Sequence, residues 1–183
     1  MKPGPNIPKT TSTAGELRIN ISKLSEGIHD YQLSTLSKNI GLDERFNDSV
    51  RVDVDIDKSS NQFYLKVKID TNGNFECDRC LERFEMHLDI SYEMAYMYRQ
   101  ATDLEEIPDD VHIIKPDMNH IDISEDVREY TMLAVPIKIL CSDDCAGLCP
   151  GCGTNLNKNK CSCGIEDSDS RWEPISKLLK NTK

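Results

Sequence analysis

Eight cysteines are the residues of this 183-residue chain whose types and spacing most plainly suggest chemistry. They fall into four pairs: Cys77 and Cys80, Cys141 and Cys145, Cys149 and Cys152, and Cys161 and Cys163. Two thiolates that are separated by two residues can bind one metal ion at about 2.3 Å in tetrahedral geometry. The pattern therefore predicts zinc knuckles, while an iron–sulfur cluster, which also takes four thiolates, stays open as an alternative.

The spacing of the pairs indicates how the eight thiols divide between metal ions. Glycines at 151 and 153 allow a tight turn that aims backbone N–H groups at the neighbouring sulfurs. The last two pairs are close in sequence, so we expect them to form one compact site: Cys149, Cys152, Cys161 and Cys163. By elimination the other four form a second site, which joins segments about 60 residues apart: Cys77, Cys80, Cys141 and Cys145.

Sites that are filled by four thiolates leave no open position for a substrate, so we expect structural metal sites and no enzyme. The histidines are isolated from the cysteine pairs: His29, His87, His112 and His120. The sequence contains no glycine-rich phosphate loop and no nucleophile elbow. A redox role for Cys77 and Cys80 is the alternative, but their flanks lack the strand-to-helix context of a thioredoxin.

The charge of the chain limits its partners. The formal net charge is −10, and residues 99–130 hold ten acidic side chains against three basic ones. Two zinc sites of four thiolates would add about −4. Because phosphate neutralisation dominates nucleic-acid affinity, a nucleic-acid-binding protein normally has a basic surface. We expect a basic protein partner, or RNA contact confined to a few residues: Lys158, Lys160, Arg171, Trp172, Lys177 and Lys180.

Alternation of apolar and polar residues predicts the strands that position the cysteines. Five segments are expected to be strands: residues 17–21, 50–56, 63–69, 84–98 and 121–124. Turn-forming residues at 57–62 and 71–74 are expected to separate the middle strands. Cys77 and Cys80 would then lie at a sharp turn between two antiparallel strands.

Helices are predicted at fewer places. A short helix is expected at residues 31–39, and a longer one at 125–135, with Ser124 as its N-cap and Pro136 just beyond its end. A terminal helix is expected to begin close to Pro174. The predicted fold class is α+β, mainly an antiparallel β-sheet with few helices and two C-terminal zinc-knuckle sites.

Three segments are predicted along the chain. Residues 1–15, rich in Pro and Thr, are expected to be a disordered leader, 16–140 a β-rich α+β core, and 141–183 a cysteine-rich zinc-binding segment with a terminal helix. The N-terminus lacks the apolar region of a secretory signal, and no stretch reaches the roughly 18 apolar residues of a membrane span. We therefore expect a cytoplasmic protein with no membrane partner and with reduced cysteines.

Three stretches of the sequence form a familiar pattern: CDRCLERF at 77–84, AVPIKILCSDDCAGLCPGCGTNLNKNKCSCG at 134–164 and DSRWEPISKLLK at 169–180. In this order they resemble the bacterial YceD family, whose members are called large ribosomal RNA subunit accumulation proteins. Some members keep only the cysteine pairs equivalent to Cys77 with Cys80 and Cys141 with Cys145, which fits a shared site. The chain departs from the family at Ser170, where proline is common.

The resemblance implies accumulation or processing of 23S ribosomal RNA, in connection with large-subunit assembly and the ribosomal protein L32. We therefore expect a non-enzymatic, zinc-binding ribosome-assembly factor with two zinc ions, each bound by four cysteines. Its expected partner is a large-subunit precursor, with 23S rRNA contacted directly or indirectly. Two alternatives stay open: a direct RNA-binding protein that protects precursor rRNA, and a thiol redox sensor.

Overall fold

The computed structural model describes residues 10–11, 15–46, 49–98, 111–115 and 117–163. The chain divides into two compact units. The first, which we call the sheet unit, consists of Met1–Glu76 and Arg83–Ile139. The second, the cysteine unit, consists of Cys77–Glu82 and Leu140–Lys183. The turn at 77–82 thus belongs with the C-terminal cysteines. The predicted core segment, residues 16–140, had included this turn.

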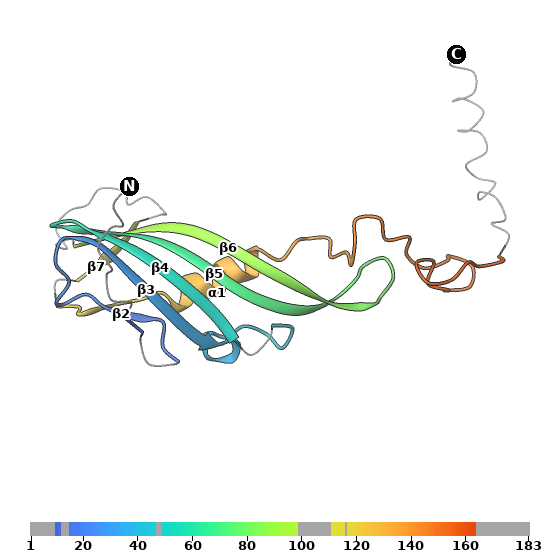
Figure 1. The fold of residues 1–183 in the computed structure, drawn as a ribbon, viewed down its shortest axis with the longest axis horizontal. Helices are drawn as coiled ribbons and strands as arrows, with labels where there is room; N and C mark the ends of the chain where they lie inside the picture. Colours follow the sequence, from blue (N-terminus) through green and yellow to red (C-terminus); the bar gives the residue numbers. More distant parts are fainter. Residues whose placement is uncertain (1–9, 12–14, 47–48, 99–110, 116, 164–183) are drawn as a thin grey trace, which may run out of the picture. The chain divides into compact units, whose positions relative to one another are not determined.

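A six-stranded sheet makes up most of the sheet unit, and its long curved strands lie side by side in Figure 1. In spatial order the strands are β1 (Thr10–Thr11), β3 (Gly27–Leu36), β4 (Ser49–Lys58), β5 (Gln62–Glu76), β6 (Arg83–Tyr98) and β7 (Val111–Ile114). The four long strands pair antiparallel, whereas the short edge strands β1 and β7 pair parallel.

The other elements of the described residues are short. Strands β2 (Arg18–Asn20) and β8 (His120–Asp122) form a two-stranded antiparallel sheet. A 3-10 helix, η1 (Ser37–Ile40), follows β3, and the α-helix α1 (Ser124–Leu133) follows β8. No helix among the described residues is long and apolar enough to cross a membrane.

The core of the sheet unit follows from the alternation along its strands. Successive side chains of a strand point to opposite faces, so one apolar face can be buried while the other stays in water. The inward valines and isoleucine of β4 are at most 1% exposed: Val50, Val52, Val54 and Ile56. Helix α1 packs on the core face of β6, where Tyr130 stacks on Tyr92 at 4.1 Å between ring centroids and Val127 is fully buried.

Most of the predicted elements are confirmed, and the observed fold is the expected mainly antiparallel sheet, with one α-helix and one short 3-10 helix in the described residues. The segments 50–56 and 63–69 lie within β4 and β5, which form the predicted hairpin. The long strand at 84–98 is β6, and its apolar face is the face turned to the core. Helix α1 covers most of the predicted 125–135 helix.

The predicted helix at 31–39 is wrong. Strand β3 continues to Leu36 and pairs with β4 from Gly27 opposite Lys58 to Leu36 opposite Ser49. Leu33 and Thr35 are buried on the core face, so pairing and burial along the whole strand outweigh the mixed local preference. Only the last residues of the segment wind, as the 3-10 helix η1.

The predicted turn at 71–74 is also wrong, because β5 runs through it without a break. Gly73 pairs with Met86 of β6 and forms an isolated bridge to Phe46. A Cβ atom at Gly73 would lie 2.4 Å from the Phe75 ring, so glycine here makes room for an aromatic side chain and does not mark a turn. The hairpin therefore extends to residues 77–82, where the first cysteine pair lies.

The N-cap prediction for α1 is wrong by one residue. Ile123 occupies the cap position without a side-chain hydrogen bond, and the Ser124 N–H instead donates to Asp122 Oδ1 at 3.0 Å. The expected terminal helix near Pro174 lies outside the described residues, and so does most of the expected leader, although Thr10–Thr11 pairs with β3 as β1.

Candidate metal centres

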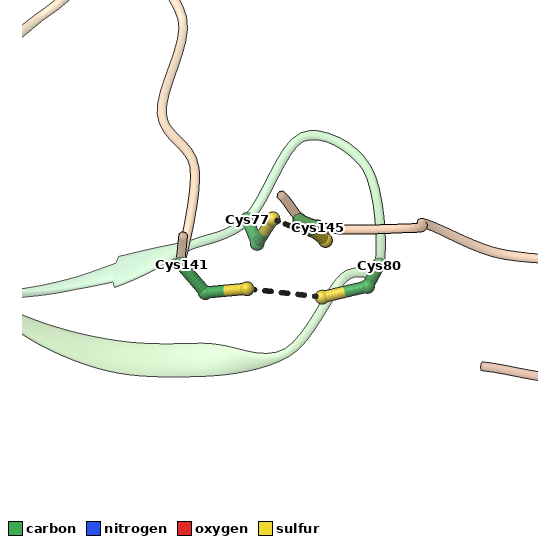
Figure 2. Close-up of side chains that lie close together, drawn as sticks. All are labelled: Cys77, Cys80, Cys141 and Cys145. Carbon is green, nitrogen blue, oxygen red and sulfur yellow. Dashed lines mark hydrogen bonds between the residues drawn. The ribbon is translucent and has the colours of Figure 1, made fainter. Parts of the chain in front are cut away.

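Four cysteines of the cysteine unit converge in a first cluster, which we call site 1: Cys77, Cys80, Cys141 and Cys145. Figure 2 shows their side chains pointing toward one another from the turn between β5 and β6 and from residues 141–145. Cys77 Sγ lies 3.8 Å from Cys145 Sγ, and Cys80 Sγ lies 3.7 Å from Cys141 Sγ. Four sulfurs at about 2.3 Å from one ion at tetrahedral angles are about 3.8 Å apart. The spacing therefore fits a single bound ion.

A second cluster, site 2, consists of Cys149, Cys152, Cys161 and Cys163. Its four sulfurs also lie within 4.8 Å of one another, and Cys161 Sγ is 3.2 Å from Cys149 Sγ. All eight cysteines are free of disulfides. The structure thus brings together the same two sets of four that the spacing suggested, while their role as metal ligands stays a prediction.

Site 1 is built on a knuckle whose backbone forms a closed turn. The Leu81 N–H donates to the Cys77 carbonyl at 2.9 Å, and the Cys77 N–H donates to the Glu82 carbonyl at 2.9 Å. Leu81 has a φ of 58°, the left-handed conformation that non-glycine residues rarely adopt. This turn places the sulfurs of Cys77 and Cys80 on the same side.

Site 2 uses a knuckle with the same hydrogen bonds. The Gly153 N–H donates to the Cys149 carbonyl and the Cys149 N–H donates to the Thr154 carbonyl, each at 2.8 Å. Gly153, which corresponds to Leu81, has a φ of 72°. The two knuckles are therefore equivalent in backbone pattern. Gly153 adopts the left-handed conformation without strain, whereas Leu81 adopts it at a steric cost.

Arg79 and Asn157 brace site 1, and neither was predicted. Arg79 Nη1 donates to the carbonyls of Asp143 at 3.1 Å and Cys145 at 2.9 Å. Asn157 Nδ2 donates to Cys145 Sγ at 3.2 Å, while its Oδ1 accepts from the Ala146 N–H at 2.7 Å. Outer hydrogen bonds of this kind orient metal ligands. The signal in the sequence was the asparagine-rich stretch after the second knuckle.

Glu82 links the first knuckle to the stretch that follows the second knuckle. Its Oε1 accepts from Lys158 Nζ at 2.7 Å and from Asn155 Nδ2 at 3.3 Å. The hydrogen bond from Lys158 holds the pKa of the Glu82 carboxyl below its usual value. Lys158, predicted to contact RNA or a partner, thus has an ion-pair partner within the unit.

The remaining predicted contact residues are placed as follows. Lys160 is exposed. The others lie outside the described residues: Arg171, Trp172, Lys177 and Lys180. No described contact therefore tests the contact role of the terminal segment.

Hydrogen bonds prepare two thiols of site 1 to ionise. Burial opposes ionisation of Cys77, but backbone N–H groups of Cys141, Cys80 and Arg79 outweigh it and lower the pKa of the thiol to about 6. The side-chain amide of Asn157 lowers the pKa of Cys145. Since thiolates are the metal-binding form, these contacts favour metal binding, and an incoming ion displaces protons from the other sulfurs.

In site 2 the pKa values of the two exposed thiols are shifted in opposite directions. Thr154, whose Oγ1 lies 3.1 Å from Cys152 Sγ, lowers the pKa of Cys152 to about 6. The neighbouring Cys152 sulfur raises the pKa of Cys163 to about 12. One sulfur therefore ionises readily, and the other gives up its proton when a cation is present.

Other candidate residues lie apart from the clusters. Among the described residues, sites 1 and 2 are the groups of His, Cys, Asp or Glu with metal-binding spacing. His112 Nε2 lies 3.5 Å from Asp126 Oδ1 instead of near a cysteine. The aspartates of β4 lie on its exposed face: Asp53, Asp55 and Asp57.

Comparison with known proteins places these features in a family. The model of the family described as "Large ribosomal RNA subunit accumulation protein YceD" matches residues 65–179, a range that includes both knuckles. No solved structure matches the chain.

Several curated proteins are similar in sequence. The chloroplastic large ribosomal RNA subunit accumulation protein YCED homolog 1 of Arabidopsis thaliana is 41% identical over 63 residues, which cover 34% of this chain and 20% of that protein. The uncharacterized protein YlbN of Bacillus subtilis is 29% identical over 150 residues, 81% of this chain and 84% of that protein. An uncharacterized protein of Mycobacterium tuberculosis is 29% identical over 105 residues, 57% of this chain and 49% of that protein. The chain thus spans a fifth of the first relative and about half of the mycobacterial one.

Proposed function

This chain belongs to the YceD family of large ribosomal RNA subunit accumulation proteins, and from this premise we propose that it is a zinc-binding ribosome-assembly factor without enzymatic activity. It would support the accumulation or processing of 23S rRNA in the large subunit, in the cytoplasm. The observation that carries the proposal is the family match over residues 65–179, which spans both four-cysteine clusters.

The geometry of the clusters supports one zinc ion in each. In a four-iron cluster each thiolate binds a different iron, so the sulfurs lie farther apart than on a single ion. Here all four sulfurs of each site lie within 4.8 Å of one another. The zinc ion itself has no redox chemistry, and four thiolates leave it no open position. Its role would be to hold the cysteine unit in one conformation that a partner recognises.

The charge distribution supports a basic protein as the direct partner. The chain is strongly acidic, and α1 exposes Glu125 and Glu129 while β4 exposes a row of aspartates. Opposite surface charges steer association. We therefore propose that the chain binds a protein of the large-subunit precursor. The family resemblance makes L32 the first candidate.

Direct contact with 23S rRNA is the second candidate. The described cysteine unit offers few free cations for it, because Lys158 is paired with Glu82 at 2.7 Å. Lys160 and the terminal residues Arg171, Lys177 and Lys180 would have to provide the phosphate contacts. RNA affinity that falls steeply with salt, and is lost when these four residues are replaced, would favour this candidate.

The test is affinity capture of the tagged full chain from lysate, divided into untreated and ribonuclease-treated halves. We expect large-subunit proteins to remain after ribonuclease treatment. Their complete loss would contradict direct protein binding and assign the contact to RNA. No ribosomal material in either half would contradict the assembly role itself.

Two variants of the chain make the affinity capture specific for the type of contact. A triple variant with Asp53→Asn, Asp55→Asn and Asp57→Asn removes three charges from the exposed face of β4, and Lys160→Ala removes one exposed cation. If an acidic surface binds the partner, the first variant weakens capture and the second does not. The reverse result would favour RNA contact.

A further inference from the structure

The two metal sites differ in how their sulfurs are shielded from water. In site 1 three cysteines are buried and only Cys141 is exposed. In site 2 only Cys149 is buried, Cys161 is partly exposed, and Cys152 and Cys163 are exposed. Two of the four cysteines of site 2 are therefore exposed to solvent, and they come from different cysteine pairs.

The two sites also differ in how their ligands are braced. The segment of site 1 at 141–145 is held by Arg79, which donates to two of its carbonyls, and by the Asn157 amide on Cys145 Sγ. Site 2 takes all its ligands from residues 149–163, and Cys163 follows the last partly buried ligand by two residues. Among the described residues, site 2 therefore joins only nearby parts of the chain, whereas opening site 1 separates two segments that hydrogen bonds hold together.

We propose that site 2 is an oxidation site for hydroperoxides, at which Cys152 and Cys163 form a disulfide and release the metal ion while site 1 keeps its own. The inference rests on the metal binding of the proposed function and adds a regulation of site 2. Exposure selects these two cysteines, and their sulfurs belong to one cluster within 4.8 Å. Oxidation of thiolates follows their accessibility.

The reaction needs only the peroxide as oxidant. The Cys152 thiolate attacks the O–O bond of hydrogen peroxide, forms a sulfenic acid and releases hydroxide. The Cys163 thiolate then attacks the sulfenic sulfur, the S–S bond forms and a second hydroxide leaves. Two electrons pass from the two sulfurs to the peroxide, and the two hydroxides take up two protons from the buffer and become water. The ion keeps two thiolates, too few to hold it, and leaves in hydrated form.

The test uses the full chain loaded with zinc, with the metal content measured first. Hydrogen peroxide is added in the presence of a zinc-binding dye, and disulfides are located by mass spectrometry. We expect release of one of two equivalents, faster than the second by about tenfold or more because access controls the rate. The new disulfide should join Cys152 and Cys163, and reductant with zinc should restore both equivalents.

Three variants make the result specific. Cys163→Ser should bind one equivalent and lose the fast phase, whereas Ser162→Ala, its exposed neighbour, should behave as the parent chain. Cys141→Ser removes the exposed ligand of site 1 and should leave the fast phase intact.

Failure of the inference is distinguishable from failure of the proposed function. Release of both equivalents at one rate, or a first disulfide within site 1, would overturn the oxidation site and leave zinc binding intact. A chain that binds no zinc before oxidation would overturn both.

Discussion

The sheet unit and the cysteine unit are stabilised by different forces. The sheet unit has a continuous apolar core to which every long strand contributes. In the described part of the cysteine unit, the buried residues are four cysteines and one glycine: Cys77, Cys80, Cys145, Cys149 and Gly147. Hydrophobic burial cannot fold such a segment, because there is almost no apolar surface to bury. We therefore propose that bound metal serves as the core of this unit.

Removal of metal is the strongest test of this comparison. Chelation of zinc should unfold the cysteine unit, because structural zinc contributes about 10–16 kcal/mol to the folding of zinc-finger peptides. The sheet unit should keep its β-sheet circular dichroism and its thermal transition. Hydrogen exchange should therefore rise at residues 140–163 and stay low in β4 and β5. Continued protection of 140–163 after chelation would contradict metal as the core.

A substitution in the apolar core should destabilise the sheet unit and leave the cysteine unit unchanged. Phe63 is fully buried and packs edge-on against Tyr98 at 5.6 Å between centroids. Phe63→Ala should lower the free energy of unfolding of the sheet unit by about 3–5 kcal/mol. The zinc content should stay at its parent value. Chemical denaturation and metal analysis of the same sample check both points, with the exposed Lys68→Ala as a control.

Replacing Asn157, which donates a hydrogen bond to a sulfur of site 1, should weaken metal binding at that site alone. Asn157→Ala removes the amide that donates to Cys145 Sγ and the acceptor for the Ala146 N–H. Zinc affinity of site 1 should fall by about 10- to 100-fold, which is typical for loss of an outer partner of a metal ligand. Competition with a chelator measures this. Asn159→Ala, an exposed asparagine two residues later, should leave the affinity unchanged, and an equal fall in both variants would contradict the role of Asn157.

The smallest expected effects concern the two equivalent knuckle positions. Gly153→Ala should destabilise the zinc-bound cysteine unit by about 1 kcal/mol, because alanine is strained at φ 72° while no atom lies within 4 Å of its Cβ. Leu81→Gly, at φ 58°, should have the opposite sign with a magnitude of at most about 1 kcal/mol. Chelator titrations of the two variants compare them directly. Effects of the same sign would show that the two turns are not equivalent.

Sequence patterns predicted the sheet well where alternation is strong and failed where it is weak. Residues 50–56 and 84–98 alternate without interruption and lie in β4 and β6 as expected. Residues 31–39 do not alternate clearly, and the neighbouring strand β4, not local preference, decides that β3 reaches Leu36. At Gly73, turn-forming composition was misleading because the space required by Phe75 explains the glycine.

The sequence by itself determined the number and type of candidate metal ligands, because cysteine spacing of two to four residues is local and suits one ion. The sequence also limited how these ligands can be grouped. If the four cysteines at 149–163 form one site, the other four remain for a second site. Only the tertiary structure decided which thiols are buried, which are exposed, and that Asn157 and Arg79 brace site 1. These properties depend on residues far apart in sequence, whose distances are set by how the whole chain packs.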